Sequence, residues 1–166
     1  MGRLVNLHSP GLATFRNNAL EVAFGFPGAE RILDGLVRHD PERWVFRNVH
    51  YYDESLKSRE ETREYAAPLC TPAGRKAFAH YLADTLAASE MRVFERALAD
   101  LDGRFPIPLR LVYARRDPMV PPVVGERLAR LLPSADMVWL EAASHFAHVD
   151  ATDAFVHAVL PFLDRA

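Results

Sequence analysis

The stretch from Pro108 to Pro118, PLRLVYARRDP, decides the fold class of this 166-residue chain. Its β-favouring residues, Leu109 to Ala114, predict a strand that ends at charged residues and a proline. A second run of this kind, Met137 to Leu140, follows a helical pattern that starts at Pro121. Two strands separated by a helix predict a parallel pair with a right-handed crossover, because parallel strands need a long connection.

Two further segments extend this pattern. Leu4 to Leu7 is a short apolar run and predicts a third strand. The residues after Val149 predict a closing helix, whose start could be capped by Asp150 or Thr152. Parallel sheets are covered on both faces, so their strands read as continuous apolar runs, as these do. We therefore expect an α/β fold with about three parallel strands and flanking helices.

The middle of the chain carries mostly helical patterns. Thr71 is a plausible N-cap for one amphipathic helix, and Ser89 for the next, which should stop at Asp102 and Gly103. The expected organisation is a sheet-bearing core of residues 1–12 and 105–166 around a mostly helical segment of residues 13–104.

Composition excludes several classes of function. A formal charge of -2 with interspersed charges gives no basic face for nucleic acid. No apolar run approaches the ~18 to 20 residues of a membrane span, and the first residues make a poor signal peptide, so a cytoplasmic setting is the default expectation. The single Cys70 agrees with a reducing compartment.

Polar residues follow the ends of both later strands. Asp117 comes three residues after Ala114, and His145 follows the Met137–Leu140 run in the segment LEAASH. Open α/β sheets place their chemistry at the carboxyl ends of the strands. A carboxylate and an imidazole at one sheet edge form the pair in which the acid orients the base and stabilises its protonated form.

These segments resemble the carboxyl-terminal half of an α/β-hydrolase. ARRDPMVP, around Asp117, is similar to the acid motif after the seventh strand, and SHFAHVD, around His145, to the histidine motif after the eighth. RLVNLHSPG resembles the sixth strand, and residues 13–104 match the position of the helical cap that many members carry. The resemblance implies a partial α/β-hydrolase fold in which Asp117 and His145 are two members of a catalytic triad.

The third member, the nucleophile, has no counterpart in the sequence. Its usual motif, G-x-S-x-G or the aspartate equivalent, does not occur. The nearest imitation is LHSPG around Ser9, but Pro10 has no backbone N–H to donate to an oxyanion hole. Ser9 is therefore not expected to be a nucleophile.

Three explanations of this pattern stay open. The chain is a truncated or split hydrolase, it pairs with another chain that supplies the missing strands, or it is a non-catalytic binding or interaction module derived from the fold. The resemblance implies a small apolar ester or related substrate, a serine or aspartate nucleophile outside this chain, and no cofactor. We expect the chain by itself to be inactive. The unpaired edge of Leu4 to Leu7 would favour self-association or a second chain.

Other residues have both a functional and a structural interpretation. A spacing of three residues puts His145 and His148 near Asp150, but without further ligands the signal is too weak to predict a metal site. His8 could face the same sheet edge. Aromatic residues in the middle of the chain could wall an apolar pocket or fill the core of the cap. The candidate pocket residues are Trp44, Phe46, Tyr51, Tyr52 and His148.

Overall fold

The structure is a computed structural model and describes residues 2–164. The chain forms two compact units. The first contains residues 2–12, 50–54 and 92–164, and the second contains residues 13–49 and 55–91. The first unit therefore includes two segments, 50–54 and 92–104, that the sequence pattern grouped with the helical part.

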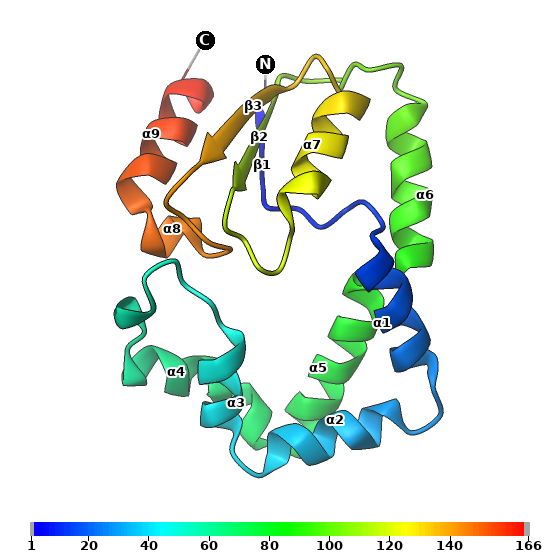
Figure 1. Cartoon of the computed structure of the whole chain (residues 1–166), viewed down its shortest axis with the longest axis vertical. Helices are drawn as coiled ribbons and strands as arrows, with labels where there is room; N and C mark the ends of the chain where they lie inside the picture. The colour runs from blue at the N-terminus through cyan, green and yellow to red at the C-terminus, as the bar shows by residue number, and fades with distance from the viewer. Residues whose placement is uncertain (1, 165–166) are drawn as a thin grey trace. The chain divides into compact units, whose positions relative to one another are not determined.

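A three-stranded sheet organises the first unit (Figure 1). Its strands are β1 (Leu4–Leu7), β2 (Leu109–Ala114) and β3 (Asp136–Leu140), in the spatial order β1-β2-β3. Both pairings are parallel, with Leu7 opposite Val112 and Val112 opposite Val138. The expected fold class is confirmed, and all three carboxyl ends lie at one edge of the sheet.

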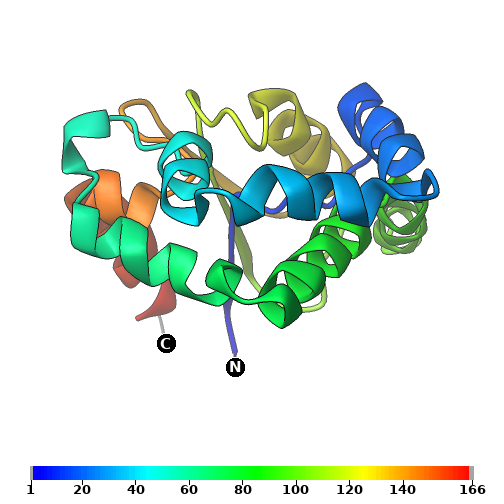
Figure 2. The ribbon, with the colours of Figure 1, turned by 90° about the horizontal axis from the view of Figure 1, so that it is seen from below.

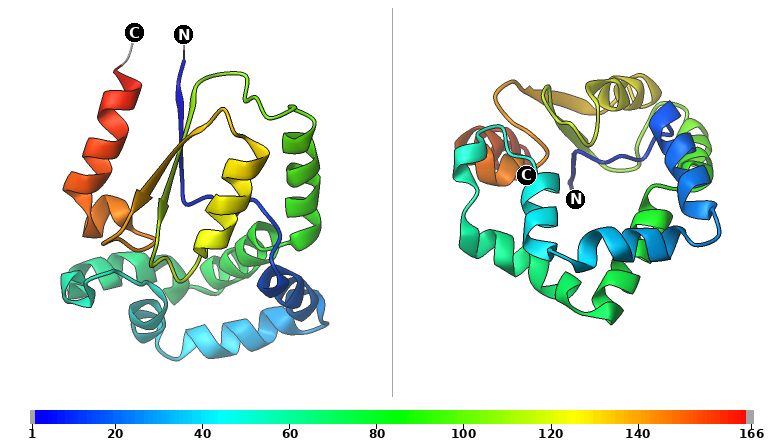
Figure 3. Two further views of the ribbon diagram at one scale, coloured as in Figure 1. Left: turned by 45° about the horizontal axis from the view of Figure 1, so that its top comes forward. Right: turned by 60° about the horizontal axis from the view of Figure 1, so that its bottom comes forward.

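Alternate residues of β2 point to opposite faces of the sheet, and each face has its own apolar cluster. On one face, Leu111 and Tyr113 pack with Leu98 of α6 (Ala88–Ala99) and with α7 (Pro122–Leu131). On the other face, Val112 and Ala114 pack with α8 (Ala147–Asp150) and α9 (Thr152–Leu163). The left view of Figure 3 shows α7 and α9 on opposite sides of the strands. This two-sided cover explains why β2 is buried along its whole length.

The second unit is helical (Figure 2). Its small core contains Val37, Val45, Ala66 and Leu69, which come from four different elements. The segment between residues 41 and 70 folds into short helices. The elements are α1 (Phe15–Gly25), α2 (Ala29–Arg38), α3 (Pro41–Asn48), η1 (Glu54–Leu56, which begins at the last residue of the first unit), α4 (Arg59–Ala66), η2 (Ala67–Cys70) and α5 (Pro72–Thr85).

The observed ends of α5 and α6 can be compared with the predicted caps. Thr71 caps α5, because its hydroxyl accepts a hydrogen bond from the Gly74 N–H at 3.0 Å, as predicted. The Ser89 prediction is wrong: α6 begins at Ala88, and the Ser89 side chain instead contacts Glu21. The helix α6 ends at Ala99, three residues before the predicted stop, and the chain turns at Asp102 and Gly103 with left-handed φ angles of 48° and 77°.

The cap prediction for the closing helix is also wrong. The N-cap of α9 is Ala151, without a side-chain hydrogen bond. Thr152 is the first helical residue, and its hydroxyl donates back to the His148 carbonyl at 2.9 Å. The Asp150 carboxylate has other partners, which are described with the site below. Within residues 2–164, the helices lack the length and apolar character that crossing a membrane would require.

Candidate active site

Three neighbouring strands each deliver one ionisable side chain to the same edge of the sheet. His8 follows β1, Asp117 lies three residues after β2, and His145 lies in the loop after β3. Nδ1 of His145 is 2.8 Å from Oδ2 of Asp117, and Nδ1 of His8 is 3.2 Å from the same oxygen. The carboxylate predicted to face His145 therefore lies between two imidazoles.

Asp117 is a buried carboxylate, and both of its oxygens have hydrogen-bond partners. Its Oδ1 accepts hydrogen bonds from the backbone N–H groups of Met119 at 2.7 Å and Val120 at 2.9 Å. Burial alone would raise the pKa of Asp117. The hydrogen bonds from His145, His8 and the Val120 N–H, together with the charge of His145, outweigh burial and hold the pKa well below its usual range. The group is therefore a fixed negative charge at neutral pH.

The phenol of Tyr113 contacts both the His8 ring and the turn after β1. Its hydroxyl donates a hydrogen bond to the Ser9 carbonyl at 2.9 Å, and its ring meets that of His8 edge-on with a centroid distance of 6.0 Å. Burial, and then the charge of Asp117, raise the pKa of Tyr113 well above its ordinary value. Tyr113 therefore keeps its proton and ties β2 to the turn after β1.

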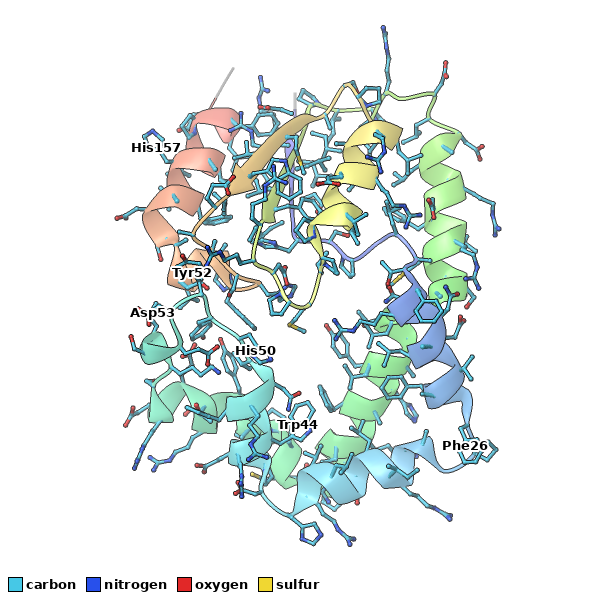
Figure 4. All side chains as sticks on the ribbon, in the orientation of Figure 1. Phe26, Trp44, His50, Tyr52, Asp53 and His157 are labelled. Atoms are coloured by element: carbon cyan, nitrogen blue, oxygen red, sulfur yellow. The ribbon has the colours of Figure 1, made fainter. Side chains whose placement is uncertain are left out.

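A second carboxylate fixes the loop that carries His145. Oδ2 of Asp150 accepts hydrogen bonds from the backbone N–H groups of Tyr52 at 2.6 Å and Ser144 at 3.2 Å. The Ser144 hydroxyl lies 2.6 Å from that oxygen and 2.7 Å from the His50 carbonyl. Figure 4 labels His50 and Tyr52 on the segment of residues 50–54. Asp150 therefore connects this segment to the residue directly before His145.

Replacing Asp150 with asparagine is expected to lower the free energy of unfolding by about 2 kcal/mol, because bonds from Tyr52 and Ser144 lose a charged acceptor. Urea denaturation followed by tryptophan fluorescence measures the loss. Asp100→Asn, at an exposed position just beyond α6, is the matched control and should change stability by less than about 0.5 kcal/mol. Equal losses in the two variants would contradict the role of Asp150.

Ser9 directly follows His8 in the chain, but its hydroxyl is engaged elsewhere. Its hydroxyl oxygen accepts a hydrogen bond from the Gly11 N–H at 3.4 Å, and its own N–H donates to Asn6 at 3.2 Å. Within residues 2–164, no hydrogen bond joins the Ser9 hydroxyl to a histidine. Both hydrogen bonds are local, so Ser9 stabilises the turn after β1.

The candidate pocket residues are divided between the two units. In the first unit, Tyr51 is buried and its ring meets that of Phe146 edge-on with a centroid distance of 5.4 Å, whereas Tyr52 and His148 are exposed. In the second unit, Trp44, labelled in Figure 4, packs on Phe78. The remaining residue, Phe46, is exposed and carries the Lys57 ammonium over its ring.

Trp44 also lines an apolar hollow inside the second unit, of about 450 Å³. The other walls include Val49, Tyr65, Leu69 and Phe78. Phe46 does not line it.

One of the three ionisable residues at this edge, His8, belongs to no catalytic motif in the sequence. Only its position directly after a predicted strand indicated that it could face this edge. Metal ligation finds no support in the geometry: among residues 2–164, no three His, Cys, Asp or Glu side chains are grouped so that they could hold a metal ion.

Comparison with known structures identifies the fold. A meta-cleavage product hydrolase of Pseudomonas fluorescens matches with a TM-score of 0.64 at 21% identity over 99% of this chain and 56% of its own. The 2-hydroxy-6-oxo-6-phenylhexa-2,4-dienoate hydrolase of a Rhodococcus strain matches with a TM-score of 0.66 at 18% identity over 99% and 56%. An enol-lactonase of Burkholderia xenovorans matches with a TM-score of 0.63 at 15% identity over 99% and 57%.

The chain thus has a partial α/β-hydrolase fold and spans little more than half the length of the structures it matches. Esterases and a bromoperoxidase also share the fold. No protein-family model and no curated protein matches the sequence.

Proposed function

We propose that this chain supplies the acid–base half of a hydrolase active site, with Asp117 as the orienting acid and His145 as the general base. The observation that carries the proposal is the 2.8 Å contact between Nδ1 of His145 and Oδ2 of a carboxylate that is fully buried. Because Asp117 is held ionised, it fixes the proton on Nδ1 and leaves Nε2 as the basic nitrogen. The His145 side chain is 26% exposed, so a reactant can reach it.

The reaction is the transfer and hydrolysis of an acyl or similar group. A nucleophile attacks the substrate and forms a covalent intermediate. Nε2 of His145 accepts the proton of a hydroxyl nucleophile and gives it to the leaving group. It then accepts a proton from the attacking water and returns it to the nucleophile as the covalent bond breaks, while Asp117 stabilises the imidazolium that forms in each step. The substrate class is a small apolar ester or a related compound.

The nucleophile is supplied by a polypeptide segment outside these 166 residues. Two observations support this step: the sequence has no nucleophile-elbow motif, and the Ser9 hydroxyl is engaged with the Gly11 N–H. The same segment would pair with the free edge of β1, because β1 pairs only with β2 within the described residues. Leu4 is 41% exposed there, which agrees with a strand that lacks its second neighbour.

The test begins with the nucleotide sequence that flanks the stretch encoding these 166 residues. An in-frame or frameshifted G-x-S-x-G or aspartate elbow is expected there, and its product should be co-expressed with the chain. The chain alone should hydrolyse 4-nitrophenyl acetate no faster than its His145→Ala variant. The co-expressed pair should show turnover that His145→Ala and Asp117→Asn remove and Ser9→Ala retains.

Two outcomes would overturn the proposal. One is turnover by the chain alone that depends on Ser9, since it would put the nucleophile in this chain. The other is a co-expressed pair that assembles but stays inactive, which would instead favour a binding module that uses the β1 edge to hold its partner.

A further inference from the structure

His8 is an ionisable residue of the site that the proposed mechanism does not use. It is 2% exposed, and its Nδ1 is 3.2 Å from Oδ2 of Asp117, the oxygen that His145 contacts from the neighbouring strand end. The two imidazole centroids are 5.7 Å apart. Asp117 therefore has one imidazole from β1 and one from the loop after β3.

The backbone at His8 is strained. Its φ angle of 51° lies in the left-handed region, which a residue with a Cβ adopts at a cost of about 1 to 2 kcal/mol. The His8 N–H also donates to the Val112 carbonyl at 3.1 Å, so the conformation is fixed to β2. Strain of this kind persists only where the surrounding structure imposes it, and it concentrates at functional sites.

The hydrogen bonds of His8 determine which ring nitrogen carries its proton. Nδ1 is 3.2 Å from the Asp117 carboxylate and 3.3 Å from the Ala114 N–H. It cannot donate to the first and accept from the second in the same tautomer. A hydrogen bond to a carboxylate is the stronger of the two, so the proton lies on Nδ1. Nε2 is then an acceptor, and among residues 2–164 it has no partner.

We infer that His8 is a positioning residue, which holds the Asp117 carboxylate in place for His145 by donating a second hydrogen bond to the same oxygen. This inference deepens the proposed function, on which its catalytic meaning rests. The hydrogen bond itself is a property of the folded chain and can be tested without activity. The simpler alternative is that His8 only fills space against Tyr113.

Two variants separate these roles. His8→Asn keeps an N–H donor close to the position of Nδ1, and asparagine tolerates the left-handed region better than most residues. His8→Ala removes the donor. Neither new side chain titrates, so a difference between the variants reports on the hydrogen bond to Asp117.

The readout is the pKa of Asp117, followed by carbon NMR of its carboxyl group and assigned with Asp117→Asn. In His8→Ala, this pKa should rise by about one unit toward the ordinary value of about 3.9, because one of the hydrogen bonds that lower it is gone. In His8→Asn, it should stay within about 0.3 units of the unmodified protein. If His8 only filled space, both variants would lose thermal stability and leave the Asp117 titration unchanged.

Among residues 2–164, the ionisable groups that interact with Asp117 are His8 after β1, Tyr113 in β2 and His145 after β3. Tyr113 keeps its proton over the whole acid range, so it does not disturb the titration. His145 is present in every variant and acts equally in all of them.

A second measurement needs no substitution. Long-range nitrogen–proton NMR of the unmodified chain reports the tautomer of His8, and the expected proton position is Nδ1. A proton on Nε2 would overturn the inference even if His8→Ala failed to fold. An unchanged Asp117 titration in His8→Ala, or a proton on Nε2 of His8, would leave the contact between Asp117 and His145 intact. An inactive co-expressed pair would leave the Asp117 titration as expected. The two proposals can therefore fail separately.

Discussion

Replacing Asp117 with alanine is expected to lower the free energy of unfolding at pH 7 by about 3 to 4 kcal/mol, the largest effect of any single change at the site. The substitution removes the acceptor for the Met119 and Val120 N–H groups and for both imidazoles. The Val120 N–H and the His8 ring are buried and lose this acceptor, which is the main source of the loss. Asp117→Asn should lose less, because an amide oxygen can still accept the two backbone hydrogen bonds.

This contribution depends on pH in a defined direction. The pKa of Asp117 is lower in the folded chain than the unfolded value of about 3.9. The ionised carboxylate therefore stabilises the fold above about pH 4, and the contribution is lost as the pH falls below the unfolded value toward the folded one. Asp117→Ala should show a shallower fall in stability between about pH 4 and pH 2 than the unmodified chain.

Urea denaturation at pH 7, 5, 4 and 3 measures both effects. The control is Asp100→Ala, at an exposed position beyond α6, which should change stability by less than about 0.5 kcal/mol. In a co-expressed, active pair, Asp117→Asn should lower kcat by a factor on the order of 10⁴, the loss known for the same change in a serine protease triad. If Asp117→Ala lowered the free energy of unfolding no more than Asp100→Ala does, the stabilising role of the Asp117 carboxylate would be wrong.

The part of this site that the sequence predicts comes from the strand pattern. Leu109–Ala114 is a continuous apolar run because both faces of β2 are covered, and such a run is visible without a structure. Once β2 and β3 are recognised as parallel neighbours, Asp117 and His145 must emerge at the same edge. The juxtaposition therefore follows from strand order alone.

The parts that the sequence does not predict depend on contacts between distant segments. Asp150 reads as a helix cap, yet its carboxylate bonds to Tyr52, 98 positions earlier in the chain. The position of His8 after a predicted strand indicates only that it could face this edge. Neither its left-handed backbone nor its contact with Asp117, 109 positions later, has a local signal. Local propensity cannot report such pairings, because the competing local and tertiary hydrogen bonds use the same atoms.

The second unit offers the other change with a large expected effect, at Gly74 near the start of α5. A Cβ built at this position would lie 1.8 Å from the Pro68 carbonyl oxygen, a backbone atom that cannot rotate away. The Gly74 N–H also donates to Thr71, the N-cap of the same helix. Only glycine lets η2 and α5 approach this closely.

Gly74→Ala is therefore expected to lower the free energy of unfolding by about 3 kcal/mol, the upper part of the range for overpacking. Gly35→Ala is the matched control in the same unit, because a Cβ there meets nothing within 4 Å and Gly35 lies inside α2. Alanine is a better helix former than glycine, so the control should gain about 0.5 to 1 kcal/mol. The melting temperature and the urea midpoint should thus fall in Gly74→Ala and rise in Gly35→Ala, although the chemical change is the same. If both variants were stabilised, the close approach of Pro68 to α5 would be wrong, and with it the shape of the apolar hollow that Pro68 and Gly74 line.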